Sequence, residues 1–256
     1  MEPSVSRTFE GKVALVTGAG SGIGRATARS LAAEGGRIVV ADIDVAAGQE
    51  TVDLIALAGG DAVCQRADVA RAGDVQAMVD RAMGAYGRLD CAVNNAGIET
   101  ESAPTAECTE ENWDRTLAVN LKGVWLCMKY EIPRMLERGG SIVNTSSVYG
   151  LIGCPGGVAY AASKHGINGM TKTTALEYAT ARIRVNSVCP GAIQTPMIDR
   201  LAANQQDYQQ RLVATEPVGR MATPDEVAAA IVWLCSDAAS FVTGIEMPVD
   251  GGWVAR

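Results

Sequence analysis

The sequence predicts an α/β fold: one domain built on a doubly wound parallel sheet with helices on both faces. Three observations support this prediction. Short apolar runs alternate with segments of helical spacing along the 256 residues, several of these runs end in glycine or polar residues, and no linker or repeat interrupts the pattern. Strands that are separated by helices pair in parallel, because each crossover returns the chain to the same end of the sheet.

The predicted elements follow one another in regular order. Apolar runs predict strands at residues 13–16, 37–41, 62–64, 89–93, 141–144, 184–188 and 245–249. Helical spacing predicts helices at 22–33, 45–58 and 73–86, with further helical segments around 112–138 and 160–180. Ligands of such sheets bind beyond the carboxyl ends of the strands, so the residues that close each strand are the candidate site residues.

Composition narrows the function classes. The chain has 22 Lys+Arg against 29 Asp+Glu, a net charge of −7, and 48% hydrophobic residues, so it is expected to fold and not to bind nucleic acid. Its longest uncharged stretch, 139–163, contains Pro, Asn and many Gly, so no membrane span is expected. Residues 1–8 are interpreted as a flexible tail without a secretory signal, and the rest of 1–256 as a single domain.

Cysteine and histidine usage gives a further expectation. The seven cysteines show no paired spacing, and His165 is the single histidine. Disulfide frameworks and zinc sites need closer pairs, so reduced thiols, a cytoplasmic location and no metal are expected.

A glycine-rich segment, Thr17-Gly18-Ala19-Gly20-Ser21-Gly22-Ile23-Gly24, lies between the first predicted strand and helix. Glycines let a backbone turn sharply and approach a ligand, and a helix N-terminus offers N–H groups to a pyrophosphate. The spacing differs from G-x-G-x-x-G, and a purely structural tight turn is the alternative. The candidate cofactor residues here are Gly18, Ser21, Gly22, Ile23 and Gly24.

Asp42 closes the second predicted strand, about 20 residues after the glycine loop, where a carboxylate can hold the adenine ribose hydroxyls. A carboxylate at this place would repel a 2′-phosphate, and position 21 in the loop is Ser, not a basic residue. The sequence therefore favours NAD over NADP. The alternative is that Asp42 caps the next helix together with Asp44.

Ser147 ends the fifth predicted strand, and Tyr160 and Lys164 follow it four positions apart. Residues four apart lie on one face of a helix, where a lysine cation can lower the pKa of a phenol. Such a tyrosine can exchange a proton with a hydroxyl group, while the serine orients the oxygen.

Together with these residues, further motifs resemble the short-chain dehydrogenase/reductases over residues 11–252, nearly the whole chain. The shared motifs include Asp68-Val69, Asn94-Asn95-Ala96-Gly97, Asn120-Leu121-Lys122-Gly123, Pro190-Gly191 with Thr195, and Asp250-Gly251-Gly252. The resemblance implies a Rossmann-like fold and a nicotinamide cofactor. It also implies that Tyr160 is the general acid/base, that Lys164 lowers its pKa and binds the nicotinamide ribose, and that Ser147 holds the substrate oxygen.

The resemblance assigns roles to other residues as well. Asn120 would kink a helix and hold a water of the proton relay. The remaining cofactor contacts that it implies are Asp68, Val69, Asn95, Ala96, Gly97, Pro190, Gly191, Ile193 and Thr195.

A substrate lid is expected at 195–218, as in relatives. Ser147, Tyr149, Cys154, Tyr160 and Met197 are the candidate substrate contacts, and no basic residue is obviously placed to hold a carboxylate. The sequence therefore predicts NAD-dependent interconversion of a secondary alcohol and a ketone, alicyclic or small and hydrophobic. The alternatives are an NADPH-dependent ketoacyl or enoyl reductase and a non-catalytic nucleotide sensor. A homotetramer is expected from relatives of this length.

Overall fold

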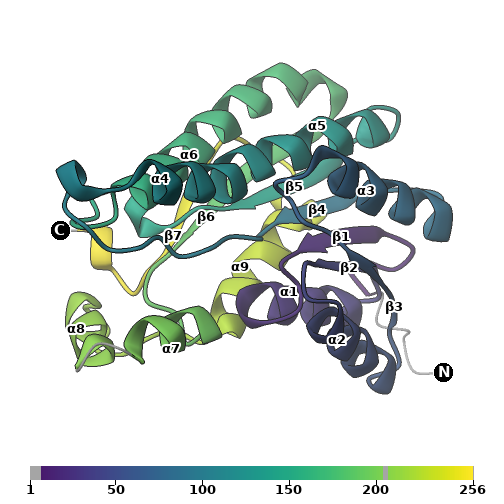
Figure 1. The fold of residues 1–256 in the computed structure, drawn as a ribbon. Helices are drawn as coiled ribbons and strands as arrows, with labels where there is room; N and C mark the ends of the chain where they lie inside the picture. Colours follow the sequence, from purple (N-terminus) through teal and green to yellow (C-terminus); the bar gives the residue numbers. More distant parts are fainter. Residues whose placement is uncertain (1–6, 204–206, 256) are drawn as a thin grey trace.

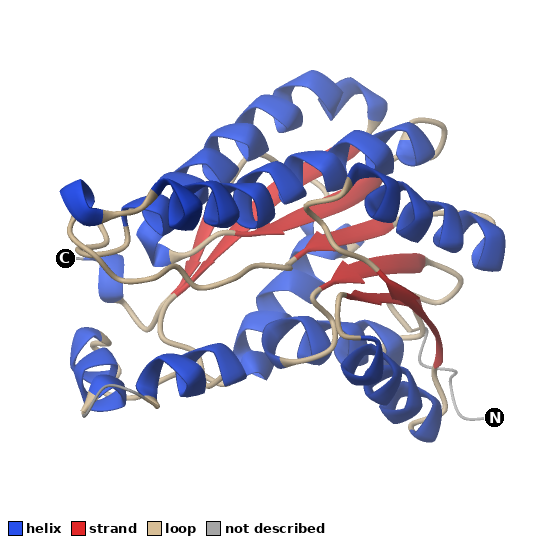
Figure 2. Cartoon of the chain, in the orientation of Figure 1, coloured by secondary structure: helices blue, strands red, loops and turns tan. Residues whose placement is uncertain are grey.

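The computed structural model describes residues 7–203 and 207–255, and within them seven parallel strands form one sheet in the order β3-β2-β1-β4-β5-β6-β7 (Figures 1 and 2). This arrangement confirms the predicted doubly wound fold. The strands are β1 (Val13–Thr17), β2 (Arg37–Asp42), β3 (Asp61–Arg66), β4 (Cys91–Asn94), β5 (Gly140–Thr145), β6 (Ile183–Pro190) and β7 (Glu246–Val249).

Helices cover both faces of the sheet (Figure 1). One apolar core joins the sheet to α3 (Ala72–Tyr86), α5 (Gly123–Met135) and α6 (Val158–Tyr178), and α4 (Glu110–Leu117) lies beside them. The opposite core joins it to α1 (Gly22–Ala33), α2 (Val45–Leu57) and α9 (Pro224–Cys235). The central strand β1 is buried at every position because both of its faces are covered.

The strands β1 and β4 are neighbours at the centre of the sheet, where the order of connection reverses. From here the chain winds outward to β3 on one side and to β7 on the other. Connections that leave neighbouring strands in opposite directions open a crevice at their carboxyl ends. The glycine loop, which follows β1, and the carboxyl end of β4 therefore both lie at this crevice.

Two short helices, α7 (Pro196–Ala202) and α8 (Tyr208–Thr215), follow β6 and lie apart from the helical layers (Figure 1). They occupy most of the predicted lid, 195–218, of which residues 204–206 lie outside the described residues. The predicted tail also falls largely outside them, since only Arg7 and Thr8 are described, both exposed.

Most predicted strand boundaries differ from the observed ones by one or two residues, and one predicted helical segment is divided. The fourth strand is assigned from Cys91 instead of residue 89, although the backbone of Asp90 still bonds to Val13 and Ser141 of the neighbouring strands, and its carboxylate accepts the Val13 N–H at 2.9 Å. The helical segment around 112–138 contains two helices joined by a π-helical turn at Ala118–Lys122. Within the described parts of the chain, no helix is long and apolar enough to cross a membrane.

Candidate active site

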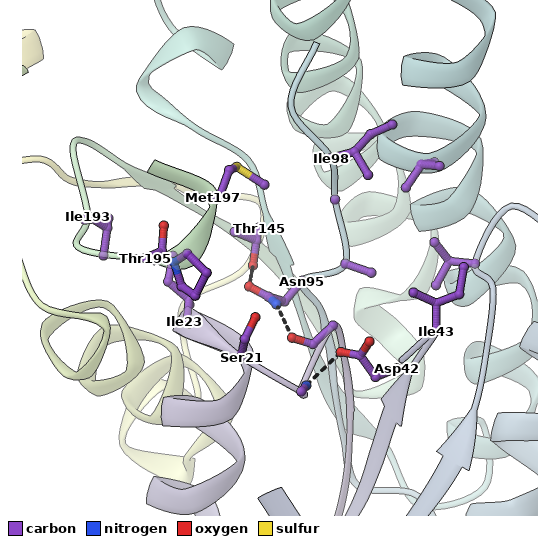
Figure 3. Close-up of a pocket in the computed structure, with 18 of the residues that line it drawn as sticks. Ser21, Ile23, Asp42, Ile43, Asn95, Ile98, Thr145, Ile193, Thr195 and Met197 are labelled. Carbon is purple, nitrogen blue, oxygen red and sulfur yellow. Dashed lines mark hydrogen bonds between the residues drawn. The ribbon is translucent and has the colours of Figure 1, made fainter. Parts of the chain in front are cut away.

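A cavity of about 560 Å³ opens at the carboxyl ends of the strands, in the crevice between β1 and β4. Its walls come from segments far apart in the sequence: the glycine loop, the ends of β2 to β6, α6 and α7. Figure 3 shows Asn95 in the middle of this cavity, with Asp42 and Ile43 on one side and Ile193, Thr195 and Met197 on the other.

The glycine loop forms one wall, and its backbone requires glycine. Gly18 and Gly22 have φ of 62° and 51°, in the left-handed region that residues with a Cβ rarely adopt. Gly24 does not line the cavity: a Cβ there would collide with the Gly18 carbonyl oxygen, so Gly24 lets α1 pack against the loop. Ser21, the N-cap of α1, makes no side-chain capping bond, and the first turn of α1 faces the cavity through Gly22 and Ile23.

Asp42 connects the second strand to the glycine loop. Its Oδ2 accepts the Gly20 N–H at 2.7 Å (Figure 3). Its Oδ1 accepts the Asp44 N–H at 2.9 Å. Asp44, not Asp42, caps α2 by accepting the N–H groups of Ala46 and Ala47. Each carboxylate oxygen has two lone pairs, so Asp42 retains acceptor capacity toward the cavity.

Gly20 is a cavity residue that the sequence analysis did not single out. A Cβ at Gly20 would lie 2.7 Å from Asp42 Oδ2, so only glycine allows this contact. The available signal was its place as the second of the four glycines in the loop.

The loop after β4 is held against the end of β1. The Thr17 hydroxyl oxygen accepts the N–H groups of Asn95 and Ala96 at 3.0 and 3.1 Å. The Asn95 amide donates to the Thr17 and Gly18 carbonyls at 3.1 and 3.3 Å. These bonds place Asn95, Ala96 and Gly97 at the cavity wall, next to the glycine loop.

The remaining predicted cofactor residues lie on the same cavity. Asp68 and Val69 follow β3, and Pro190, Gly191, Ile193 and Thr195 follow β6. Gly22 faces Thr195 closely enough that a Cβ on Gly22 would lie 3.2 Å from the threonine methyl group, so the two walls meet here. Every predicted cofactor residue except Gly24 therefore lines one cavity.

The three predicted catalytic side chains converge at the other end of the cavity. Lys164 is buried, and its Nζ donates to the Thr145 carbonyl at 2.8 Å and lies 5.4 Å from the centre of the Tyr160 ring. Ser147 is buried, its Oγ accepts the Tyr149 N–H at 3.2 Å, and its own O–H is available to donate to the Tyr160 oxygen. The hydroxyl of the preceding residue, Ser146, donates to the Lys164 carbonyl at 3.0 Å.

The predicted lowering of the Tyr160 pKa is wrong for the protein in this state. Burial raises the pKa of Tyr160 to about 12, although a hydrogen bond with Ser147 acts in the opposite direction. Burial also lowers the pKa of Lys164 to about 8. Desolvation opposes the charged forms of both groups, and it outweighs the attraction that the lysine was expected to supply. The phenol is therefore protonated at neutral pH.

Asn120 lies at the π-helical turn and is fully buried, outside the cavity wall. Its Oδ1 accepts the Ile98 N–H at 2.8 Å, and its Nδ2 donates to the Ile98 carbonyl at 2.9 Å. The helix is distorted here, as the resemblance implies, and the side chain fixes the cavity residue Ile98.

The predicted substrate contacts are divided. Met197, Ser147 and Tyr160 line the cavity, whereas Tyr149 and Cys154 are not among its lining residues. The Tyr149 ring packs edge-on against Tyr160 and Trp253, at centroid distances of 6.5 and 5.5 Å. Tyr149 therefore buttresses the phenol in this structure.

A basic residue besides Lys164 lines the cavity, and the expectation that none is placed to hold a carboxylate stays a prediction. Arg200 of α7 reaches its wall and pairs with Glu99, 101 positions earlier. No local pattern signals a pair so far apart in the chain.

No group of three or more His, Cys, Asp or Glu side chains arranged for a metal ion is found in residues 7–203 and 207–255.

Comparisons with known proteins agree with this geometry. A family model described as enoyl-(acyl carrier protein) reductase matches residues 18–254. Cyclohexanol dehydrogenase of Acinetobacter sp. (strain SE19) is 46% identical over 257 residues, which cover 100% of both chains. The chain belongs to the short-chain dehydrogenase/reductase family.

Other members of the short-chain dehydrogenase/reductase family are also similar. A 2,5-dichloro-2,5-cyclohexadiene-1,4-diol dehydrogenase of Sphingobium indicum is 46% identical over 96% of this chain and 98% of its own. A proposed 2-deoxy-D-gluconate 3-dehydrogenase of Agrobacterium tumefaciens, solved with NADP bound, has a TM-score of 0.89 and 37% identity, covering 99% of this chain and 100% of its own. As a member of this family, the chain is an oxidoreductase that uses a nicotinamide cofactor.

Proposed function

We propose that this protein interconverts an alicyclic secondary alcohol and its ketone, with NAD as the preferred cofactor. The observation that carries the proposal is one cavity that holds the glycine loop and Asp42 at one end and Ser147, Tyr160 and Lys164 at the other. The glycine cradle and the first turn of α1 fit a dinucleotide, because a Cβ on Gly20 or Gly24 would fill or distort it. Gly18, Ser21, Gly22 and Ile23 would hold the pyrophosphate.

The catalytic residues have distinct roles in this proposal. A bound nicotinamide supplies the hydride acceptor or donor. For ketone reduction, the protonated Tyr160 hydroxyl donates its proton to the carbonyl oxygen; for alcohol oxidation, its phenolate accepts the hydroxyl proton. Ser147 donates its O–H to the same oxygen. The Lys164 ammonium group, fixed by the Thr145 carbonyl, favours the phenolate once it forms. Asn120 positions Ile98 at the cavity.

Two observations support an uncharged ring substrate. Ile98, Met197 and Ile198 are apolar residues of the cavity, and both cations at its wall have protein partners. Relatives named for cyclohexanol and cyclohexadiene-diol substrates are each 46% identical to this chain. The testing experiment follows nicotinamide reduction by absorbance with NAD or NADP and a panel of cyclic, linear and aromatic secondary alcohols. Turnover confined to charged hydroxy acids or acyl-carrier substrates would contradict the proposal.

A second candidate is a ketoacyl or enoyl reductase of the same fold, which the description of the matching family model favours. The panel distinguishes it when acyl thioesters are included with NADPH. The third candidate function is a nucleotide sensor without turnover. The presence of Ser147, Tyr160 and Lys164 at the cavity argues against this candidate.

The preference for NAD rests on Asp42 and on the surrounding cations. Arg25, just past the glycine loop, donates to the Gly20 carbonyl and to Thr51, and it pairs with Glu50 at 2.6 Å. Arg66, at the end of β3, pairs with Asp74 at 2.7 Å. These partners support a site in which a carboxylate, and not a free guanidinium, faces the adenine ribose.

Replacing Asp42 tests this preference. Asp42→Asn keeps an oxygen for the Gly20 N–H but removes the negative charge, so we expect the ratio of kcat/KM for NADP to that for NAD to rise about tenfold or more. Asp44→Asn is the matched control, because asparagine caps a helix as well as aspartate does. An unchanged ratio in Asp42→Asn would show that Asp42 does not select the cofactor.

We also propose a homotetramer, because two separate apolar surfaces are exposed. A groove of about 390 Å³ crosses α4, α5 and α6, and its lining residues are Asp114, Leu117, Ala118, Leu121, Lys122, Trp125 and Met170. Near the edge strand β7, Phe241 is fully exposed and Trp233 and Ile245 are each 40% exposed. A closed tetramer with dihedral symmetry needs at least two kinds of self-complementary interface.

Light scattering checks the tetramer. We expect the mass of four chains for the native protein and of two chains for Phe241→Glu, since a buried charge opposes the second interface. A native mass of one chain would contradict the proposal.

We further propose a cytoplasmic location, which the seven free thiols support.

A further inference from the structure

Arg200, which lines the cavity, forms an ion pair with Glu99, the residue after the lining residue Ile98. Glu99 follows Ile98 in the loop after β4, and Arg200 lies on α7, one turn after Met197. The Arg200 Nε lies 2.9 Å from Glu99 Oε1, and its Nη2 lies 3.1 Å from Oε2. Both carboxylate oxygens are therefore bound by a single guanidinium group.

This ion pair neutralises a charge at the cavity. Pairing with Arg200 lowers the pKa of Glu99, and pairing with Glu99 raises the pKa of Arg200, so both groups are charged at neutral pH. The Glu99 side chain is 29% exposed and the Arg200 side chain is 59% exposed. Ion pairs that are exposed to this degree add little to folding stability. The main consequence of this ion pair is that the edge of the Arg200 guanidinium group that can bind a carboxylate through two hydrogen bonds is already occupied by Glu99.

The other charged groups nearby do not release Arg200 from its pairing with Glu99. Arg115 also favours the charged form of Glu99, but its nearest carboxylate contact is Glu101, at 3.6 Å. Lys164, the second cation of the cavity wall, is buried and donates to the Thr145 carbonyl. A carboxylate entering the cavity thus meets an Arg200 whose guanidinium group is already paired with Glu99.

We propose that Glu99 is a specificity-determining residue: by occupying Arg200, it restricts the cavity to uncharged alcohols and ketones. This inference rests on the proposed function. Guanidinium groups bind carboxylates in the same two-bonded geometry that Glu99 now uses, so a substrate carboxylate would compete for the same face. Removing the charge of Glu99 should convert Arg200 into a binding site for ring substrates that carry a carboxylate.

The test compares Glu99→Gln with the native enzyme on cyclohexanol and cis-4-hydroxycyclohexanecarboxylate. Glutamine keeps the size of the side chain but releases the guanidinium. We expect kcat/KM for the carboxylate substrate to rise about tenfold or more, mainly through a lower KM, and that for cyclohexanol to change less than about threefold. The double variant Glu99→Gln/Arg200→Gln should lose the gain, and Glu101→Gln, which changes the neighbouring pair with Arg115, should not produce it.

A binding measurement separates this inference from the proposed function. Calorimetric titration with cyclohexanecarboxylate, in the presence of NADH, needs no turnover. We expect Glu99→Gln to bind this probe at least about tenfold more tightly than the native protein. Equal affinities would overturn the role of Glu99 even if cyclohexanol is oxidised. Tighter binding without turnover of any alcohol would support the role of Glu99 and contradict the proposed function.

Discussion

Replacing Tyr160 by phenylalanine is expected to lower kcat for the alcohol and for the ketone by about 10² to 10⁴, because the variant has no hydroxyl to exchange a proton. This loss corresponds to about 3 to 5 kcal/mol of transition-state stabilisation. The aromatic ring remains, so its contact with Tyr149 and its place in the cavity wall are kept. NADH affinity, measured by fluorescence titration, should change little.

Tyr178→Phe is the matched control for Tyr160→Phe. Tyr178 ends the same helix, α6, and packs against the apolar core away from the cavity. We expect this variant to keep the native kcat. A Tyr160→Phe protein that retains more than about a tenth of the native kcat would contradict proton transfer by this residue. If the native protein binds NADH but turns over no substrate, the nucleotide-sensor reading gains support instead.

The second large effect is expected at Glu131, which lies on α5 and is fully buried. Its Oε2 accepts a hydrogen bond from the Asn94 amide at 3.1 Å, while its Oε1 has no partner. The same amide donates to Asn144, whose own amide donates to Thr171 at 3.0 Å. No cation is paired with Glu131 in the part of the chain that the structure describes.

This environment makes folding stability depend on pH. Burial raises the pKa of Glu131 to about 8, against an ordinary value of 4.5 that applies when the chain is unfolded. Between these two values the folded protein holds a proton that the unfolded chain releases. The contribution of Glu131 to stability is therefore fully present below about pH 4.5 and falls as the pH rises to about 8. The loss amounts to about 4 to 5 kcal/mol, at 1.36 kcal/mol for each pKa unit.

Glu131→Gln should remove this penalty, because the amide is neutral at every pH. At pH 8 we expect the variant to exceed the native free energy of unfolding by several kcal/mol, which raises the melting temperature by about 10 °C. At pH 4.5 the difference should be small. Thermal and urea unfolding across this pH range measure the effect.

Glu137→Gln serves as the control for Glu131→Gln, since Glu137 is an exposed residue just beyond the end of α5. Its unfolding curves should match those of the native protein at both pH values. A Glu131→Gln variant without added stability at pH 8 would show that the buried carboxylate is charged and satisfied in the folded protein.

The cofactor end of the cavity was predictable from the sequence because its signals are local. The glycine loop and Asp42 lie at the ends of neighbouring strands, and such ends meet at one edge of a parallel sheet. The spacing of Tyr160 and Lys164 likewise places both side chains on one face of a helix. For these residues the predicted element boundaries were close enough to bring the right side chains to one cavity.

The tertiary structure alone decided the features that depend on burial or on distant partners. The direction of the Tyr160 pKa shift is set by the apolar surroundings of the phenol, and the motif that contains Tyr160 carries no information on them. The pairing of Glu99 with Arg200 joins segments 101 positions apart, and the buried hydrogen bond between Glu131 and Asn94 joins segments 37 positions apart. Desolvation and long-range pairing arise only when the chain is packed, whereas backbone turns and helical spacing are properties of neighbouring residues.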